Sequence, residues 1–529
     1  MPARTARPGL GWGLTLPALA IAALYTIPPV LLVATTRPSG SLPFSLARVL
    51  SWTTLQAAAS ASIAVALGWP AGVLAGFYGH RLARALRSLG LPVFMAPSVA
   101  VVLGFRGVYH GLLGGTPLSA LARGATGVIA VHSYFNIPLA AVLTAAAASR
   151  SPPEALEYFT SIGLRGARLW VRALLPLTAP GAAAAWLLAF TYSFMGLTAP
   201  LMVPGAAYRY YTLEAWIYTL FQGFPTLRGL AVWASGLQLA ALTSLAAAFA
   251  WLHSRLPSIE SSGASVSLPL RGAARLAASA YMALLYAYLL IPLAGVAYTS
   301  IWGPAGGHPS LEAYRRLAEG RAPIPPGASL WLALANSLAY AGASAALAVA
   351  AAALAAPVSG PLVRAALTAP LAVSPVVAGL GLYFTLFKPL AGRLGIAWAS
   401  RLLIVAAHTA VALPLAARSI ESGVARVPRE AVEFAASIGL RGARLALQLA
   451  RSAGESMLAG GLLAAAASLG EFGGVLVLSV PETWSLGVLT YRLYGAGRVP
   501  DLAAASATLL LALTLALTAL VARRVERWL

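Results

Sequence analysis

The nine residues SIGLRGARL occur twice in this chain, at Ser161–Leu169 and again at Ser437–Leu445, which is 276 positions later (437 − 161). Each copy places two arginines and two glycines between long apolar stretches. An identical polar segment in both parts of an apolar chain indicates a duplicated unit whose copies keep one task. We therefore expect two similar halves, each with one such segment.

The composition is that of a membrane protein. Of the 529 residues, 59% are hydrophobic and 9% are charged, whereas soluble domains carry about 25% charged residues. The net charge of +22 comes from short arginine clusters between apolar runs, so we expect a lipid membrane and no nucleic acid as its surroundings. The absence of cysteine excludes disulfides and thiol chemistry.

Twelve apolar runs are long enough to cross a bilayer, because a spanning helix needs about 20 residues. Six precede the middle of the chain and six follow it. The expected fold class is therefore all-α integral membrane, with twelve transmembrane helices. The runs lie near residues 12–35, 50–78, 86–108, 126–148, 177–201, 226–253, 272–299, 330–356, 364–387, 397–419, 453–480 and 500–522.

The repeat extends beyond the nine residues. At the same spacing His132 matches His408, and Glu154 matches Glu430. Six spans in each unit give both units the same topology, so the repeats are expected to be parallel. The polar, Ser-rich stretch between them is expected to be a linker. The predicted division is 1–255 for the first half, 256–270 for a cytoplasmic linker and 271–529 for the second half.

The distribution of arginine predicts the orientation. With the N-terminus inside, more than half of the 36 Lys and Arg residues fall in cytoplasmic segments or at the adjoining span ends, as the positive-inside rule requires. Both copies of SIGLRGARL then lie inside. We expect a multi-pass protein of the plasma membrane with cytoplasmic N- and C-termini.

The segment around the first copy, Ser151–Pro176, is predicted to form a helix–turn–helix outside the bilayer. Ser151 followed by two prolines and Glu154 is typical of a capping box. Gly163 suits a left-handed turn, and a second helix is expected over Leu164–Leu175. On it three arginines at spacing i, i+3 and i+7 would share one face: Arg165, Arg168 and Arg172.

Two surroundings fit such a loop. Its arginines could rest on anionic lipid headgroups, as in an interfacial amphipathic helix. A protein partner is favoured by the acids of the first helix in each copy, because an anionic surface would repel them. Two equivalent loops would also suit a two-fold partner. The acids are Glu154 and Glu157 in one copy and Glu430 and Glu433 in the other.

The segment resembles the EAA loop of binding-protein-dependent ABC importer permeases. That pattern is Glu-Ala-Ala, three residues, Gly, nine residues, Ile, one residue and Leu-Pro. The glutamate and the glycine match in both copies, whereas the alanines are largely replaced and the second copy lacks Leu-Pro, so its last turn is expected to pack differently. The matching positions are Glu157-Tyr158-Phe159, Gly163, Ala173 and Leu175-Pro176, then Glu433-Phe434-Ala435, Gly439, Leu449 and Arg451-Ser452.

Other segments agree with that family, namely Thr212–Tyr218 (TLEAWIY), Ser485–Tyr491 (SLGVLTY) and Ser468–Gly474 (SLGEFGG). A fused pair of halves is most similar to the permeases of iron(III) and thiamine importers, with polyamine and sulfate or molybdate permeases as more distant relatives. The resemblance implies the type I ABC importer permease fold. It further implies alternating access that moves a small solute inward.

The resemblance also implies partners. Two ABC ATPase subunits would bind on the cytoplasmic side and an extracytoplasmic solute-binding protein on the other, with ATP and Mg held by the ATPases and no cofactor or metal bound by this chain. The loops would act as coupling helices. The coupling residues are then Glu154, Glu157, Gly163, Arg165, Arg168, Arg172, Glu430, Glu433, Gly439, Arg441 and Arg444.

The residues themselves are consistent with an external energy source. A Walker A loop needs Gly-Lys-[Ser/Thr], and the sole lysine, Lys388, precedes Pro389. An enzyme is not expected, because the chain has a single aspartate, Asp501, and its histidines show no metal-ligand spacing. A gradient-driven secondary transporter or a channel is the alternative from another class; it predicts recurring charges in the spans and no docking loops.

Glu471 is the most informative single residue, because it lies in the middle of an expected span, where an ionisable group is costly and usually functional. Its counterpart in the first half is Met195. A lone carboxylate would suit a cationic solute on a translocation path; equally, it could pair with backbone or a histidine and brace a gate. His132 and His408 could line that path or pack against backbone carbonyls, and Asn136 could add a polar group.

The longest outer loop, 300–329, is expected to hold a short helix between Ser310 as N-cap and Gly320 as C-cap. It could touch a partner, or it could simply connect two spans.

Overall fold

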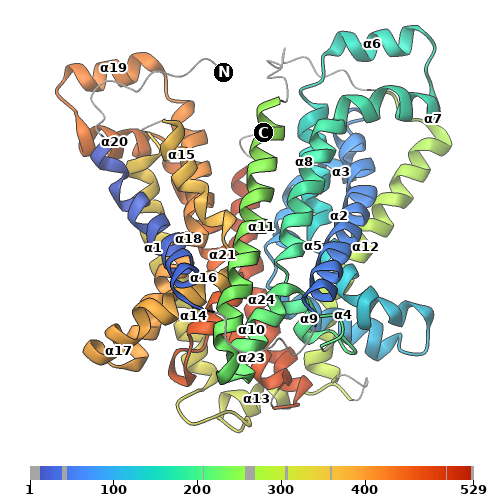
Figure 1. Ribbon diagram of the computed structural model, residues 1–529. Coiled ribbons are helices and arrows are strands. Elements are labelled where there is room, and N and C mark those ends of the chain that lie inside the picture. Colours follow the sequence, from blue (N-terminus) through green and yellow to red (C-terminus); the bar gives the residue numbers. More distant parts are fainter. Residues whose placement is uncertain are drawn as a thin grey trace.

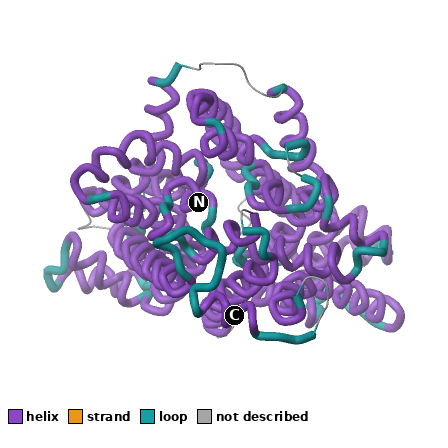
Figure 2. Tube along the Cα trace, turned by 90° about the horizontal axis from the view of Figure 1, so that it is seen from below, coloured by secondary structure: helices purple, strands orange, loops and turns teal. Residues whose placement is uncertain are grey.

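The computed structural model describes residues 12–37, 45–206, 208–255, 268–303, 308–357, 360–495 and 497–525. Every regular element in these ranges is a helix, as Figure 2 shows in an end-on view. Most of the expected linker 256–270 lies outside the described residues. Its last residues are described, and there the amide of Leu268 donates a hydrogen bond to the carbonyl oxygen of Phe77 (2.8 Å).

Ten helical runs in the described ranges are long and apolar enough to cross a membrane. The chain is therefore a multi-pass helical membrane protein in its architecture. The runs are Gly13–Thr35 (with α1, Leu16–Thr35), Leu46–Gly76 (α2), Gly124–Ala148 (α5), Gly166–Phe194 (with α7, Gly166–Leu169, and α8, Leu175–Phe194), Pro225–Phe249 (within α11, Arg228–Arg255), Gly272–Trp302 (α12), Leu330–Ala355 (α14), Pro375–Leu394 (with α16, Pro375–Leu382, and α17, Lys388–Leu394), Ile396–Ala425 (α18) and Pro500–Val521 (within α24, Pro500–Val525).

Shorter helices complete the bundle. They are α3 (Arg81–Phe94), α4 (Ser98–Phe105), α6 (Pro153–Ser161), α9 (Thr198–Met202), α10 (Leu213–Gly223), α13 (Glu312–Ala318), α15 (Pro361–Thr368), α19 (Arg429–Ser437), α20 (Gly442–Ser452), α21 (Gly454–Gly470), α22 (Gly473–Leu478) and α23 (Leu486–Gly495).

The expected runs 177–201 and 364–387 are interrupted, between Phe194 and Thr198 and between Thr368 and Pro375, although part of each lies in a long helical run. Two further expected spans match no long helical run. The run 86–108 divides into α3 and α4 at Met95–Pro97, and the run 453–480 divides into α21 and α22 at Glu471. Proline 97 cannot donate the amide hydrogen bond that would continue the first helix. The physical reason for the second break is the Glu471 carboxylate, described below.

Glycines set the closest helix pair, α2 against α5. Gly68, Gly72 and Gly76 recur every four residues along one face of α2. A methyl group at these glycines would lie 2.6, 2.5 and 2.4 Å from side-chain carbons of α5. Small residues at this spacing let two helix backbones approach closely, which is how helices associate where no hydrophobic effect drives them together.

The first long helix of each half packs on the opposite half. Helix α1 lies against α16 and α18, and α12 lies against α4 as well as against α24 of its own half. At each crossing a glycine contacts a proline. A methyl group on Gly104 would lie 1.8 Å from the carbonyl oxygen of Pro292, and a methyl group on Gly381 would lie 2.5 Å from the nitrogen of Pro29. The two halves are therefore interlocked rather than separate bodies.

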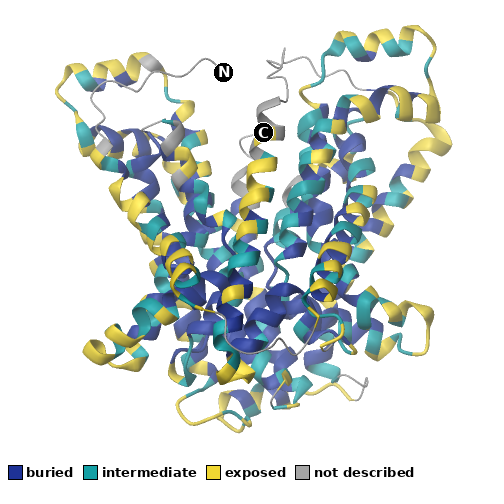
Figure 3. Cartoon of the chain, viewed as in Figure 1, coloured by how far each residue is buried: buried dark blue, intermediate teal, exposed yellow. Residues whose placement is uncertain are grey.

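The helices diverge toward one end of the molecule, where α6 and α19 lie far apart, and converge toward the other, around α10 and α23 (Figure 1). Buried residues gather where the helices converge, whereas α6 and α19 are largely exposed (Figure 3). Helix α13 lies at the tip of the converging end.

The expected outer helix is present as α13, but its caps are Leu311 and Glu319 rather than Ser310 and Gly320. Each predicted residue lies one position outside its cap: the Ser310 hydroxyl accepts a hydrogen bond from the Glu312 amide (3.1 Å), and Gly320 has a φ of +71°. Arg316 lies 3.6 Å from Asp501 at the start of α24, and Leu317 is buried. The Arg315 guanidinium, bonded to Glu319, lowers the pKa of that carboxyl. These contacts within the chain favour the connecting-helix interpretation.

Candidate functional site

Both copies of SIGLRGARL lie at the diverging end of the bundle, in loops that begin with α6 and α19 (Figure 1). Helix α6 covers Pro153–Ser161 and α19 covers Arg429–Ser437, so the two helices have equal length at the spacing of the repeat. The chain then turns and enters α7 at Gly166 or α20 at Gly442. The two copies therefore share one backbone form.

Two glycines make each turn. Gly163 and Gly439 have φ of +83° and +87°, which confirms the expected left-handed turn; glycine reaches this region without the penalty that other residues incur. Arg165 and Arg441 are extended (φ −142° and −139°). The prediction of a helix from Leu164 is therefore wrong: the second helix begins at Gly166, and Arg165 does not share a helical face with Arg168 and Arg172.

The expected capping box is also wrong. Helix α6 begins at Pro153, so its N-cap is Pro152, whose side chain offers no acceptor. Ser151 lies one position earlier, and its hydroxyl instead donates to the Ala147 carbonyl oxygen at the end of α5 (3.2 Å). Glu154 remains in the first turn of α6, where a carboxylate complements the helix dipole.

Each loop combines a buried anchor with an exposed apolar tip. Leu156 and Leu169 are buried in the first loop, and Val432 and Leu445 in the second. Four large apolar side chains are exposed at matching positions: Tyr158 (60%), Ile162 (56%), Phe434 (66%) and Ile438 (62%). The predicted coupling residues around them are all exposed: Glu154, Glu157, Gly163, Arg165, Arg168, Arg172, Glu430, Glu433, Gly439, Arg441 and Arg444.

The loops differ in how they join the bundle. In the first loop the Trp170 indole donates to the Tyr78 hydroxyl (3.0 Å) and stacks on that ring; burial raises the pKa of Tyr78. The run from Gly166 to Phe194 is one continuous helix. In the second loop α20 ends at Ser452 and α21 starts at Gly454, so the last turn packs differently, as the missing Leu-Pro predicts.

Glu471 lies at the break between α21 and α22, and its carboxylate caps α22. Its two oxygens accept hydrogen bonds from the amides of Gly474 (2.9 Å) and Val475 (3.3 Å). Nε2 of His408 lies 3.2 Å from Oε2 of Glu471, although the angle is not that of a hydrogen bond. Both side chains are buried. These contacts favour the bracing role for Glu471.

The first half has a related arrangement without the carboxylate. Nδ1 of His132 lies 2.7 Å from Oε1 of Gln56, and Gly196 leaves room for the other ring nitrogen, since a methyl group there would lie 2.2 Å from it. Asn136 donates to the His132 carbonyl oxygen (2.8 Å). Met195, at the position of Glu471, ends α8 beside Phe190 and Phe194.

The two histidines bond side chains rather than backbone carbonyls. Nδ1 of His408 lies 2.5 Å from the Ser468 hydroxyl, as His132 meets Gln56. The interpretation that they pack against backbone carbonyls is therefore wrong. Each histidine instead ties a long helix of its half, α5 or α18, to a neighbouring helix.

Sequence reasoning missed a second buried carboxylate, Glu214. It is 1% exposed and lies on α10 of the first half. One oxygen accepts from the amide of Val376 in α16 (3.3 Å), and the other accepts from Gln238. Glu214 therefore connects the first half to a helix of the second. Its signal was an acid inside the apolar segment TLEAWIY, where intramembrane acids are rare.

The two carboxylates share a neighbour. Tyr25 of α1 is buried near both carboxylates, and its hydroxyl lacks a hydrogen-bond partner among the described residues.

Comparison with known proteins adds no family: no protein-family model and no curated protein matches the sequence.

Proposed function

We propose that the chain is the permease subunit of an ATP-driven ABC importer, which moves a small solute inward by alternating access. The observation that carries the proposal is the pair of loops at α6 and α19. They have the same backbone form, lie at the same end of the bundle and expose the same kind of tip, an aromatic residue and an isoleucine among acids and arginines.

In this proposal the architecture is twelve spans in two parallel six-helix repeats of the type I permease fold. The ten long helices and the two broken runs support that number. The helix bounds also recur at the repeat spacing: α6 and α19 begin 276 residues apart (429 − 153), and α8 and α21 end 276 residues apart (470 − 194). The diverging end would face the cytoplasm of the cell, with both termini on that side of the plasma membrane.

The partners follow from the loops. Each tip would insert into one of two ATPase subunits, because exposed large apolar groups beside charges are typical of docking surfaces. The ATPase subunits would hold ATP and Mg. A solute-binding protein would deliver solute at the converging end. The chain itself would not be an enzyme. Iron(III) or thiamine is the favoured class of solute, with polyamine, sulfate or molybdate as the alternatives.

The geometry suggests how docking would reach the gate. Helix α21 begins two residues after α20 and ends at Glu471; its 17 residues span about 25 Å. A force on α19 and α20 would therefore move a helix whose other end carries the carboxylate cap of α22. In the first half α8 likewise connects the α6–α7 loop to Met195.

A gradient-driven transporter is the second candidate, and one observation favours it. Glu214, Glu471 and His408 form a buried ionisable set, as proton- or ion-coupled carriers require. The carboxylates are, however, engaged by backbone amides, Gln238 and His408, and two exposed, matched docking loops have no role in that alternative.

ATP hydrolysis tests the proposal. The full chain, purified with its ATPase, is compared with the variant Ile162→Asp/Ile438→Asp. More than half of each isoleucine side chain is exposed. Burial of this apolar surface on docking would contribute about 1–2 kcal/mol of binding free energy at each loop. An aspartate would lose this contribution and add the cost of removing a charge from water. We expect ATPase binding to weaken at least 30-fold and hydrolysis to fall.

The control variant is Leu311→Asp/Leu394→Asp, which places two acids on exposed leucines of the other end and should leave hydrolysis intact. Uptake of labelled iron(III) or thiamine by vesicles that contain the complex then identifies the solute. Hydrolysis and ATP-driven uptake that persist in the loop variant would refute the coupling role.

A further inference from the structure

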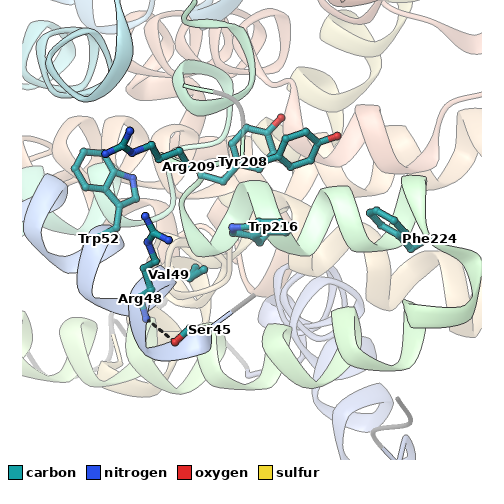
Figure 4. A pocket seen from close by; sticks show the side chains of 9 residues that line it. Ser45, Arg48, Val49, Trp52, Tyr208, Arg209, Trp216 and Phe224 are labelled. Atoms are coloured by element: carbon teal, nitrogen blue, oxygen red, sulfur yellow. Dashed lines mark hydrogen bonds between the residues drawn. The ribbon is translucent and has the colours of Figure 1, made fainter. Parts of the chain in front are cut away.

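A cavity of about 690 Å³ lies beside α2, α10 and the segment between α9 and α10 (Figure 4). Its walls are basic and aromatic. Arg48 comes from the first turn of α2, and Arg209 comes from the segment before α10; Trp52, Tyr208, Tyr211 and Trp216 provide the aromatic faces. None of its nine lining residues is an acid.

The two arginines line the cavity without an acid among its residues. Figure 4 draws both arginine side chains on the Trp52 side of the cavity. Within the described ranges neither forms an ion pair, and Arg209 instead stacks over Tyr210 (5.4 Å from guanidinium carbon to ring centre). Like charges that line one cavity repel each other, and an anion bound between them would remove the repulsion.

The aromatic walls are built rather than incidental. The Trp52 indole donates to the Tyr210 carbonyl oxygen (2.9 Å). Tyr208, Tyr211 and Trp216 contact one another with ring centres 5.4–5.9 Å apart. Tyr208 has a φ of +56°, a left-handed conformation that is strained for a residue with a side chain and is often kept at ligand sites.

The cavity lies at the level of one membrane surface. The C-terminal end of α2 packs against the α6 loop, since Val73 and Phe77 share a cluster with Leu156. Arg48 lies at the opposite end of this 31-residue helix, which is about 46 Å long. Tryptophan, tyrosine and arginine at the end of a spanning helix are typical of the headgroup region.

An apolar track continues from the cavity along the helix. Arg48, Trp52, Leu55 and Ile63 follow at i, i+4, i+7 and i+15, which places them on one face of α2. Leu55 and Ile63 are 63% and 41% exposed. A charged head in the cavity and an acyl chain along these side chains would together cover this face.

From these observations we infer that the cavity binds the phosphate of an anionic phospholipid, with Arg48 and Arg209 on the phosphate and the acyl chain against Leu55 and Ile63. The second half has no equivalent site. The amide of Leu213 bonds Thr53 as the amide of Leu486 bonds Ser337, and by this equivalence Arg48 and Arg209 correspond to Leu332 and Glu482. The chain would thus carry one specific lipid on its first half. This inference goes beyond transport and is independent of the solute.

The test measures lipid binding directly. The full chain is purified in detergent, freed of lipid and titrated with radiolabelled phosphatidylglycerol in mixed micelles. The variant Arg48→Gln/Arg209→Gln should bind about 30-fold more weakly, since each arginine contributes about 1 kcal/mol to an anionic headgroup. Arg48→Lys/Arg209→Lys keeps both charges and should retain most of the binding, which separates lost charge from lost folding.

The matched control is Arg37→Gln/Arg393→Gln, which removes two exposed arginines that do not line the cavity. It should bind like the unmodified chain. An equal loss in this control would show diffuse surface attraction and overturn the inference. Unchanged binding in the Arg48/Arg209 variant would overturn it as well.

Two competitors identify the source of the anion. Inorganic phosphate at millimolar concentration should not displace the lipid, because it lacks the acyl chain; displacement would show a site for a free anion. Polyglutamate represents the acidic surface of a protein partner, and displacement by it would assign the cavity to protein docking. Either displacement would refute the lipid site.

Discussion

The substitution Glu471→Ala tests the proposed brace at the break between α21 and α22. It removes the acceptor of two buried amides, those of Gly474 (2.9 Å) and Val475 (3.3 Å). A hydrogen bond to a charged group contributes about 1.5–3 kcal/mol. Two such bonds would contribute about 3–6 kcal/mol. Water that enters the site of the lost carboxylate would replace part of this, so we expect the first turn of α22 to lose about 3 kcal/mol of local stability.

Hydrogen–deuterium exchange of the full chain in detergent measures that loss. Where exchange follows local opening, 3 kcal/mol corresponds to roughly 100-fold faster exchange of the amides of Gly474–Leu478. Glu471→Gln keeps one acceptor oxygen, so the same amides should exchange about tenfold faster than in the unmodified chain. The amides of α5 should exchange at their original rate in both variants.

The control is Glu455→Ala, which removes an exposed carboxylate from the first turn of α21 and should not change exchange in α22. If Glu471→Ala exchanges like the unmodified chain, the carboxylate does not hold α22, and the bracing interpretation is refuted.

Two further predictions concern other parts of the chain. Glu214→Ala removes two buried hydrogen bonds, one of them to the other half, and should lower the stability against denaturant by about 2–4 kcal/mol. Thr490→Val, on α23 of the second half, removes only a bond to Ser506 and should cost about 1 kcal/mol, so equal losses would contradict a special role for Glu214. Gly163→Ala places a residue with a side chain at φ +83°, although the space around it is open, and should cost about 1–2 kcal/mol of stability. The expected result is faster proteolysis of the α6 loop. Gly454→Ala, in helix α21 with no atom nearby, should not lower stability, and equal cleavage of both variants would exclude strain at Gly163.

Composition was enough to predict the helical membrane architecture, because long apolar runs have few alternatives in a bilayer. It could not predict the breaks in runs 86–108 and 453–480. The length of an apolar run predicts that the segment lies in the membrane, but it does not predict whether the segment forms one continuous helix. At Glu471 the break depends on a carboxylate that turns back onto the next helix, which is a tertiary arrangement.

In the loops the glycine turn was predictable and the helix starts were not. Gly163 and Gly439 need a left-handed φ that few other residues adopt, so the sequence is a direct signal there. The start of α7 depends on the second glycine, Gly166 (φ +53°), which leaves Arg165 extended. Ser151 matched a capping pattern, but the two prolines after it moved the start of α6 by one residue.

The buried carboxylates show why pattern alone misassigns sites. Glu214 follows Thr212, which does cap α10 by accepting from the Ala215 amide (3.3 Å), so Glu214 resembles an ordinary first-turn acid. Its role appears only when α16 of the other half is placed beside it. His132 and His408 were found from the repeat, but their side-chain partners, Gln56 and Ser468, lie on other helices.

The most direct test of the proposed coupling uses the absence of cysteine from the chain. A single cysteine in place of Ile438 is labelled with a benzophenone maleimide and irradiated in native membranes, with and without ATP. The proposal predicts a covalent adduct between the chain and an ATPase polypeptide whose yield changes with ATP, and none from a cysteine in place of Leu311. Adducts with lipid alone at position 438 would contradict it.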